Sequence, residues 1–320
     1  MKFRLVESMF KRTNESASQY ANREDIPYSI TDDIELICDL MAFGLDEFSY
    51  LIGVPVDALA NIDNYSPNRD VANKVYDFAF SNGIYLNEIK WTDYKEQYNE
   101  RYAEQYSASE EQCNHIVLSH GSRSGIWGDI RVDVSGDSND FANGFYCGES
   151  LRQAGMFVSA EPEASLYVID FNKEGLVPLN FNLSTEWMLA IAFYRNKITQ
   201  YANHPRIKSI IDSVNGCDYI IAPIADNKMF EIIDAFTNGE ITDTQCAYAL
   251  SATYLGKQYV MKTERAASQC KRIDKFYMCP LEKSRYSHKA EEEMNTSIHK
   301  ATVAKKKYRD SGKYIFEILN

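Results

Sequence analysis

The sequence has no long hydrophobic run. No window approaches the roughly 18 apolar residues of a membrane-spanning helix, and the N-terminal stretch MKFRLVESMFKRTNES lacks the apolar core of a signal peptide. These absences argue against membrane proteins and exported proteins. We therefore expect a cytoplasmic protein without a membrane partner.

Common catalytic and metal-binding motifs are also missing. The seven cysteines are an odd number without a CxxC pair, which predicts neither a disulfide framework nor a structural zinc site and fits a reducing compartment. No P-loop, GxSxG or HExxH motif occurs, so the commonest ATPases, serine hydrolases and zinc proteases lack their residues here. We expect no metal.

Positive charge is scarce. The chain has 34 Lys and Arg against 46 Asp and Glu, a net charge of −12 and a pI near 5.0. Binding to phosphates requires at least a local excess of cations, so any contact with nucleic acid must be local. A cationic run near the C-terminus, opposed within that run only by Asp310, is either a solvated helix or a phosphate-facing patch; it comprises Lys300, Lys305, Lys306, Lys307, Arg309 and Lys313.

The 320 residues, 45% of them hydrophobic, are enough for about two domains with a sizeable core. The pattern predicts an α+β protein, in which a small all-α domain precedes a domain with a mixed sheet and helices. The expected parts are an N-terminal segment (1–30), a helical domain (31–90), a linker helix (91–114), the mixed-sheet domain (115–280) and a charged C-terminal helix (281–320).

Short helical patterns fill residues 31–90. Asp32 or Asp33 is expected to cap the first helix. Two short helices are expected after it, one in LDEFSYLIGV and one in PVDALANIDNY, joined by a turn at residues 53–55. This outline resembles the helix-turn-helix domains of the phage-repressor type. Only three cations face eleven acidic residues between positions 30 and 90, which favours docking to a protein partner over binding to DNA.

Strand and helix patterns alternate from Ile116 onward. Apolar, β-branched and aromatic content predicts strands over 116–120, 165–171, 218–226 and 257–263. Helical periodicity predicts helices over 184–202, 229–239 and 242–256, with Ser184, Thr185 and Thr242 as possible caps.

Three separated segments carry the most specific pattern. In order, SHGS at 119–122, GFYCGES at 144–150 and GKQYVMKT at 256–263 resemble the signature segments of the ADP-ribosyltransferase fold in its diphtheria-toxin and poly-ADP-ribose-polymerase branch. The longer segments DFANGFYCGES, SVNGCDYIIAPIADN, FTNGEI and GKQYVMKTE are similar to a bacterial family in which such a domain often follows a small helix-turn-helix. The resemblance covers roughly residues 115–275.

The resemblance implies NAD⁺ as co-substrate and assigns roles in binding it. His120 would donate a hydrogen bond to a hydroxyl of the adenosine-side ribose, and the backbone of Gly121 would meet the nicotinamide carboxamide, where a Cβ would obstruct the approach. Tyr146 and Phe157 would sandwich the nicotinamide ring. Ser122 would assist His120, and Ser150 is a weaker candidate for the carboxamide.

The third segment departs from many active members of this fold, which place a glutamate where this chain has Gln258. A neutral amide binds a ribose hydroxyl but cannot act as a base, and losing a general base typically costs about 10²–10⁴-fold in rate. The chain would then use a nucleophile that needs no base, or a carboxylate from elsewhere. Asp226 is the first candidate, followed by Asp218 and Glu264.

Each of these residues also has an ordinary structural interpretation. His120 could make only a local hydrogen bond, Tyr146 and Phe157 could be core aromatics, and Gln258 could be a strand residue. Arg195 is expected to form a structural salt bridge with a carboxylate such as Asp218.

The leading hypothesis is a mono-ADP-ribosyltransferase with His120, Tyr146 and Gln258 as its catalytic residues, acting on a macromolecular acceptor as a toxin, a phage-defence factor or a housekeeping modifier. The alternatives are a catalytically weak nucleotide-sensing regulator and a DNA-binding transcription regulator.

Overall fold

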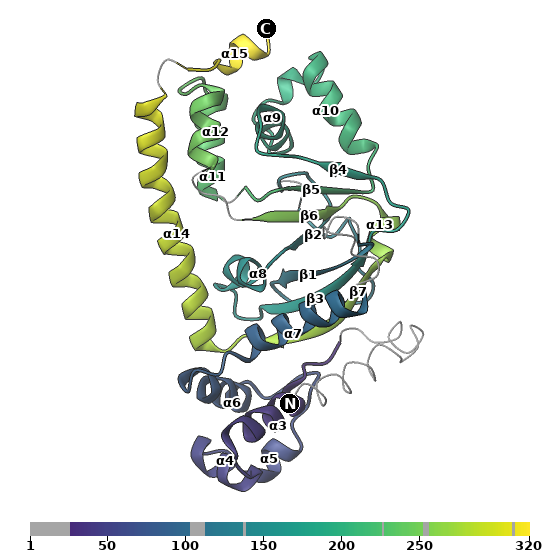
Figure 1. Ribbon diagram of the computed structural model, residues 1–320, viewed down its shortest axis with the longest axis vertical. Helices are drawn as coiled ribbons and strands as arrows, with labels where there is room; N and C mark the ends of the chain where they lie inside the picture. Colours follow the sequence, from purple (N-terminus) through teal and green to yellow (C-terminus); the bar gives the residue numbers. More distant parts are fainter. Residues whose placement is uncertain (1–25, 103–112, 137–138, 226, 252–255, 309–310) are drawn as a thin grey trace. The chain divides into compact units, whose positions relative to one another are not determined.

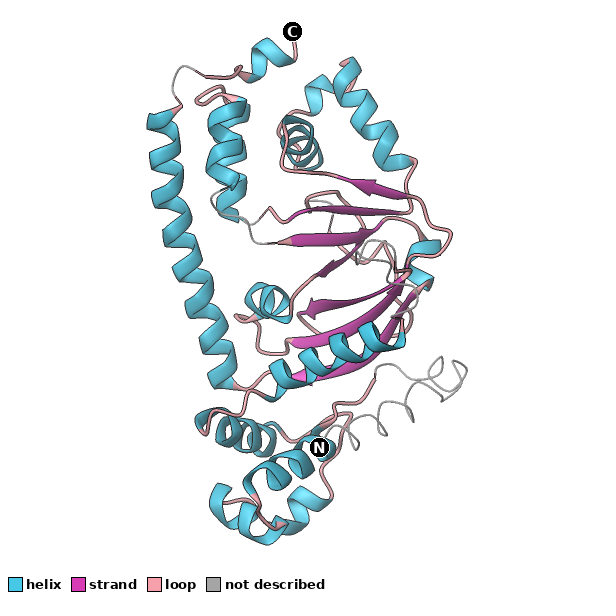
Figure 2. Ribbon diagram, viewed as in Figure 1, coloured by secondary structure: helices cyan, strands magenta, loops and turns pink. Residues whose placement is uncertain are grey.

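The computed structural model describes residues 26–102, 113–136, 139–225, 227–251, 256–308 and 311–320. Within these ranges the chain has the mixed α and β content expected from the sequence (Figures 1 and 2). The helices are α3 (Ile30–Met41), α4 (Leu45–Ile52), α5 (Val56–Ala60), α6 (Arg69–Ser81), α7 (Leu86–Arg101), α8 (Leu151–Val158), α9 (Thr185–Tyr194), η2 (Thr199–Tyr201), α10 (Pro205–Asn215), α11 (Asn227–Thr237), α12 (Asp243–Ser251), α13 (Glu264–Ser268), α14 (Pro280–Lys307) and α15 (Ile315–Ile318). The strands are β1 (His115–Ser122), β2 (Phe145–Gly148), β3 (Ser165–Asn172), β4 (Pro178–Asn180), β5 (Tyr219–Pro223), β6 (Lys257–Met261) and β7 (Cys270–Tyr277).

The chain divides into two compact units, each made of several segments. The first contains residues up to 130, 150–172 and 270–287, and the second contains 131–149, 173–269 and 288–320. The seven strands found in the described residues belong to a mixed sheet. The first unit holds the strands β1-β3-β7 in that order, and the second holds β4-β5-β6-β2.

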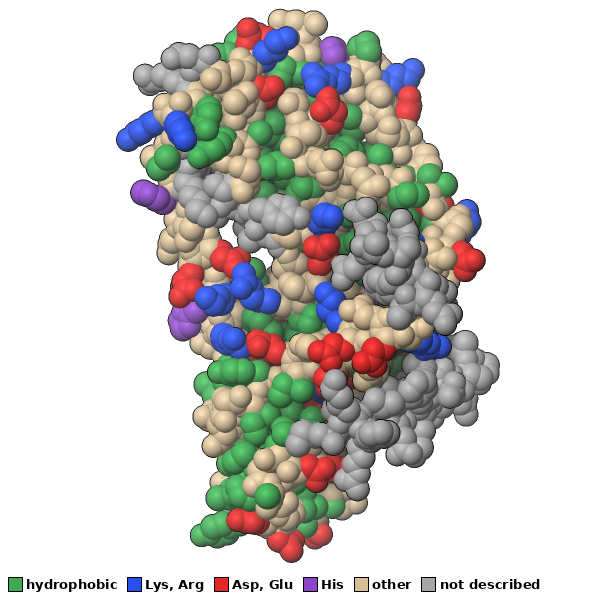
Figure 3. Space-filling model, in the orientation of Figure 1, with side chains coloured by type: hydrophobic (Ala, Val, Ile, Leu, Met, Phe, Trp, Pro, Cys, Tyr) green, Lys and Arg blue, Asp and Glu red, His purple; other side chains and the backbone are tan. Residues whose placement is uncertain are grey.

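Helices α3–α6 form the N-terminal part of the first unit around their own hydrophobic core, which includes Ile30, Phe48 and Val75. Helix α3 begins about one turn before the start that a cap at Asp32 or Asp33 would give. Its N-cap is Ser29, so Asp32 and Asp33 lie in its first turn, and the prediction that either caps it is wrong. On the face shown in Figure 3, hydrophobic and acidic side chains gather over these helices.

A buried ionic cluster joins these helices to strand β7 within the first unit. The Lys90 ammonium lies 3.1 Å from the Asp33 carboxylate and 3.7 Å from that of Asp274, and all three side chains are at most 3% exposed. Tyr76 and Tyr94 donate hydrogen bonds to Asp33 (2.5 Å) and Asp274 (2.9 Å), respectively. The two carboxylates face only one ammonium, and the hydrogen bonds from the two tyrosine hydroxyls therefore also stabilise their negative charge.

The sheet of the first unit is antiparallel, with β3 paired to β1 on one side and to β7 on the other. Helices α7 and α8 pack on it through a second core, which includes Trp91, Leu151, Val158 and Phe276. In Figure 1, α7 runs alongside β3 and β7. Its buried tyrosines place it in the core, where a polar linker helix had been expected.

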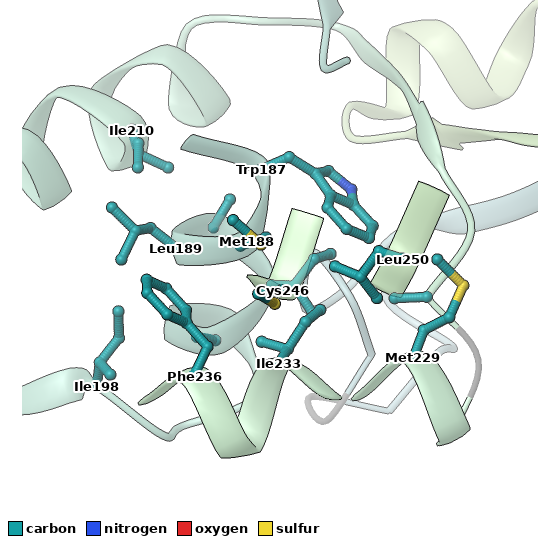
Figure 4. Packing of buried hydrophobic residues seen from close by; sticks show 14 of the residues in the cluster. Trp187, Met188, Leu189, Ile198, Ile210, Met229, Ile233, Phe236, Cys246 and Leu250 are labelled. Carbon is teal, nitrogen blue, oxygen red and sulfur yellow. The ribbon is translucent and has the colours of Figure 1, made fainter. Parts of the chain in front are cut away.

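In the second unit, β4 is parallel to β5, while β5 pairs with β6 and β6 with β2 in antiparallel fashion. Helices α9, α11 and α12 supply most of its core. Figure 4 shows their side chains meeting there, among them Trp187 of α9, Phe236 of α11 and Leu250 of α12, all of them fully buried. Ser184 caps α9 by accepting a hydrogen bond from the Trp187 amide, as predicted.

Candidate functional site

His120 lies near the end of β1, in a row of side chains that crosses the first unit's sheet. It pairs with Tyr167 of β3, which in turn pairs with Lys275 of β7. Directly opposed residues share one face of a sheet, so these three side chains lie on the same side. The rings of His120 and Tyr167 are 6.4 Å apart between centroids. The imidazole is half-buried beside an aromatic neighbour.

Gly121 allows β1 to pack closely against α8. A Cβ at this position would lie 2.6 Å from the Ala154 carbonyl oxygen and 3.1 Å from the Val158 methyl groups. The group that a Cβ at Gly121 would meet is thus a helix of the same unit and not a ligand. Its predicted contact with a nicotinamide carboxamide stays a prediction.

Two predicted serines hold local structure. The Ser122 hydroxyl donates to the Gly125 carbonyl at 2.9 Å. Ser150 is the N-cap of α8, where its hydroxyl accepts from the Gln153 amide at 3.2 Å, and its carbonyl accepts from Ser119 at 2.6 Å. Both serines therefore shape the backbone around His120.

Phe157 is on the outer side of α8. Its side chain is 72% exposed, whereas Leu151, Ala154 and Val158 form the buried face of the helix. Phe157 is therefore not a core aromatic, which removes one of its two interpretations.

In the second unit, Tyr146 is part of strand β2. Its hydroxyl donates to the Ala142 carbonyl at 2.6 Å and accepts from the Phe141 amide at 3.1 Å. Burial raises the pKa of the Tyr146 phenol, so the group stays neutral at physiological pH. Tyr146 is therefore a neutral aromatic residue, and its ring packs against the core of the second unit.

Gln258 is next to a carboxylate, that of Asp140. The Gln258 Nε2 donates to Asp140 Oδ2 at 2.7 Å and to the Pro223 carbonyl at 3.0 Å. Asp140 also accepts from Arg195 Nε (2.9 Å) and Nη2 (2.5 Å) and from the Ala225 amide (3.2 Å). Both Gln258 and Asp140 are more than nine-tenths buried.

The Asp140 carboxylate is buried, and hydrogen bonds from Gln258, Arg195 and the Ala225 amide compensate for its burial. Burial raises the pKa of Asp140, while Arg195 and the Gln258 amide oppose that shift by stabilising the charged form. The Arg195 guanidinium also stacks over the Phe230 ring at 4.4 Å. Arg195 thus forms the structural salt bridge expected of it, with Asp140 in place of Asp218.

The carboxylates named from the sequence are engaged elsewhere. Asp218 accepts from the Val177 amide and from Thr263, both at 2.9 Å, and the first of these bonds lowers the pKa of Asp218. Glu264 accepts from the Val132 amide at 3.3 Å. Both flank the Tyr219–Met261 end of the β5–β6 pair, whereas Gln258 pairs with Ala222, three residues or about 10 Å along the strand. Asp226 lies outside the described residues.

Asp140 was missed although it opens the quoted segment DFANGFYCGES. Its position as an acidic residue in one of the signature segments could have identified it from the sequence. Nothing local links it to Gln258, which is 118 positions away.

Within the described residues, no group of three His, Cys, Asp or Glu side chains could hold a metal ion. No helix in the same ranges is long and apolar enough to cross a membrane. The predicted site residues thus fall into two groups: His120, Gly121, Ser122, Ser150 and Phe157 in the first unit, and Tyr146 and Gln258 in the second.

The chain is similar to a protein family described as being of unknown function, DUF3990, whose model matches residues 116–271. No curated protein matches the chain, and no solved structure does. The matched range contains all the predicted site residues and Asp140, and helices α3–α7 lie outside it.

Proposed function

We propose that this chain is a mono-ADP-ribosyltransferase that cleaves NAD⁺ between nicotinamide and ribose and transfers ADP-ribose to a macromolecular acceptor. Support comes from the pairing of β2 with β6, in which Gly148 is opposite Gln258 and Tyr146 is opposite Val260. Opposed residues share a sheet face, so Tyr146 and Gln258 lie on the same face. Two of the three signature segments are thus neighbours in the second unit.

The contact between Asp140 and Gln258 carries the proposal. Two acceptors, the carboxylate and the Pro223 carbonyl, both bind the Gln258 Nε2, which fixes the orientation of the amide. Its Oε1 is then the atom that accepts a hydrogen bond from a ribose hydroxyl. Asp140 acts through Gln258 as a positioning residue, because its carboxylate holds the amide in one orientation.

Neither residue of this pair serves as a general base. Gln258 has no basic group to accept a proton, and the Asp140 carboxylate is held by Arg195 and a backbone amide. We therefore infer an acceptor whose nucleophile needs no deprotonation by the enzyme. The resemblance assigns the adenosine-side ribose to His120 and the nicotinamide ring to Tyr146 and Phe157; His120 and Phe157 belong to the first unit, and Tyr146 belongs to the second.

Release of nicotinamide from NAD⁺ by the purified chain tests this function. We expect slow release by the wild type and at least a tenfold loss in His120→Ala, the size of one lost ligand hydrogen bond of about 1.4 kcal/mol. His288→Ala is the matched control, because His288 is an exposed histidine on α14. Equal release by wild type and His120→Ala would remove His120 from the site.

A nucleotide-sensing regulator is the second candidate. The Asp140–Arg195 ion pair favours this function, because a carboxylate held by Arg195 does not serve as the general base that Gln258 cannot supply. Calorimetry would then show saturable NAD⁺ binding, sensitive to His120→Ala, in a protein that releases no nicotinamide over hours.

A further inference from the structure

The first unit contains a cavity that none of the predicted NAD⁺-binding residues lines. Its volume is about 630 Å³, within the range of small-molecule sites. Its walls come from the residue segment before α3, the loop before α6 and the start of that helix, the loop after β1, the loop before β3, strand β7 and the start of α14. All of these segments belong to the first unit.

The charge of this cavity is opposite to that of the chain. Its lining contains the cations Arg69, Lys275 and Lys283 and the single carboxylate of Glu163, whereas the whole chain carries −12. Arg69 and Glu163 form an ion pair at the rim, with side chains 50% and 61% exposed. Exposed pairs of this kind are weak, so Arg69 can exchange its partner for a bound anion. An anion entering the cavity would meet a net positive field.

The two lysines are built into the wall. Lys275 is 6% exposed, and its ammonium lies 4.3 Å from the centre of the Tyr28 ring. The Lys283 ammonium donates to the Glu161 and Pro162 carbonyls, each at 2.9 Å. Burial and the neighbouring Arg69 lower the pKa of Lys283. These cations are held in place before any ligand arrives, which reduces the entropic cost of binding.

Trp127 presents an aromatic surface at the same cavity. Its side chain is 62% exposed, whereas Trp91 and Trp187 are buried. Its indole nitrogen donates to the Ser124 carbonyl at 3.1 Å. Large exposed aromatic side chains beside cations are typical of surfaces on which bases stack.

The loop that carries Trp127 is fixed to the sheet by hydrogen bonds on both sides of Ile126. The Ile126 amide donates to the Tyr167 hydroxyl at 2.9 Å, and its carbonyl accepts from Arg272 at 2.8 Å. Ser122 anchors Gly125 in the same loop. The tryptophan is thus an exposed group on a rigid support.

We propose that this cavity binds a nucleoside phosphate, with the base stacked on Trp127 and the phosphate groups beside Arg69 and Lys275. The exposed indole favours a ligand with a base over a simple anion, and the cations favour a charged ligand over an apolar molecule. The proposal goes beyond the transferase function and does not depend on it. It assigns the chain a second nucleotide site, built from the N-terminal helices and the sheet of the first unit.

Titration of tryptophan fluorescence with ATP tests the proposal, because Trp127 is the exposed one of the three tryptophans. We expect saturable quenching. Adenosine and inorganic triphosphate, each offering half of the recognised chemistry, should bind at least about tenfold more weakly. In calorimetry, Trp127→Ala and Arg69→Ala should each weaken ATP binding by about three- to tenfold, and Lys74→Ala, on the same helix but outside the cavity, should leave it unchanged.

His120→Ala separates this site from the NAD⁺ site, because it should weaken ATP binding less than Trp127→Ala and Arg69→Ala do. Absence of ATP binding at millimolar concentration, or ATP binding that is unaffected by both Trp127→Ala and Arg69→Ala, would overturn the proposal. So would binding of a single-stranded oligonucleotide that ATP does not displace.

Discussion

Replacing Gln258 with glutamate should destabilise this chain. In the structure the side chain donates to Asp140 at 2.7 Å, so Gln258→Glu would place two carboxylates in contact. Two negative charges at that distance repel by about 6 kcal/mol at an effective dielectric constant of about 20. Protonating one of them relieves the repulsion and costs about 3.7 kcal/mol at pH 7 for a group with an unperturbed pKa near 4.3.

The net penalty at pH 7 is therefore about 2 to 4 kcal/mol, because the protonated form of the introduced carboxyl would still donate to Asp140. Its pH dependence has a definite sign. The new carboxyl has a higher pKa in the folded state than in the unfolded state, so the folded state binds more protons and the variant gains stability as pH falls. The penalty should shrink by about 1.4 kcal/mol per pH unit between pH 7 and pH 5.

Urea unfolding followed by tryptophan fluorescence at several pH values measures this penalty. Gln258→Met is the control, because it removes the hydrogen bond without adding a second carboxyl, so its penalty should vary less with pH than that of Gln258→Glu. The double variant Asp140→Asn with Gln258→Glu should recover part of the loss by exchanging donor and acceptor. A Gln258→Glu protein as stable as the wild type at pH 7 would refute the contact with Asp140.

Two further substitutions test other parts of the structure. Gly121→Ala should lower the free energy of unfolding by about 1 to 3 kcal/mol, since its Cβ would lie 2.6 Å from the Ala154 carbonyl; an unchanged urea midpoint would contradict the close packing of β1 and α8. Burial raises the pKa of Glu282 to about 7, so this group stabilises the fold below pH 4.5 and loses that contribution as pH rises through 7. Glu282→Gln should therefore be more stable than the wild type at pH 8, by up to about 3 kcal/mol, and equal to it near pH 4.5, whereas parallel stability curves would show that Glu282 titrates normally.

Much of the fold was predictable where apolar periodicity is strong. The strands expected over 116–120, 165–171, 218–226 and 257–263 correspond to β1, β3, β5 and β6, and the three helices expected between 184 and 256 correspond to α9, α11 and α12. The apolar faces of β5, β6 and the three helices bury against the core of the second unit, and those of β1 and β3 bury against the core that they share with α7 and α8. The helices α4 and α5 also occur where the repeated apolar positions placed them, on either side of residues 53–55.

Strand β7 was missed because its sequence, CKRIDKFY, is rich in charge. Asp274 and Lys275 are nevertheless buried in it, the first beside Lys90 and the second over the Tyr28 ring. Their partners lie far away in the chain, so no local pattern reveals them. Strand β4 was missed for a different reason, since its three residues are too few to show alternation.

The candidate site was predictable to a similar extent. Segment order identified Tyr146 and Gln258, and the structure pairs their strands. The carboxylate beside Gln258 depends on a hydrogen bond between residues 140 and 258, and such a long-range contact leaves no trace in spacing. Phe157 was indicated by spacing alone, and only its exposure on α8 distinguishes it from a core residue.

Transfer of labelled ADP-ribose is the most direct test of the proposed function. NAD⁺ labelled in its adenylate part would be incubated with the purified chain and a cell lysate, and macromolecules would be separated and treated with protease or nuclease. The account predicts label on one class of macromolecule with wild type and His288→Ala, and at least about tenfold less label with His120→Ala. Label that is absent with wild type, or equal in all three proteins, would contradict it.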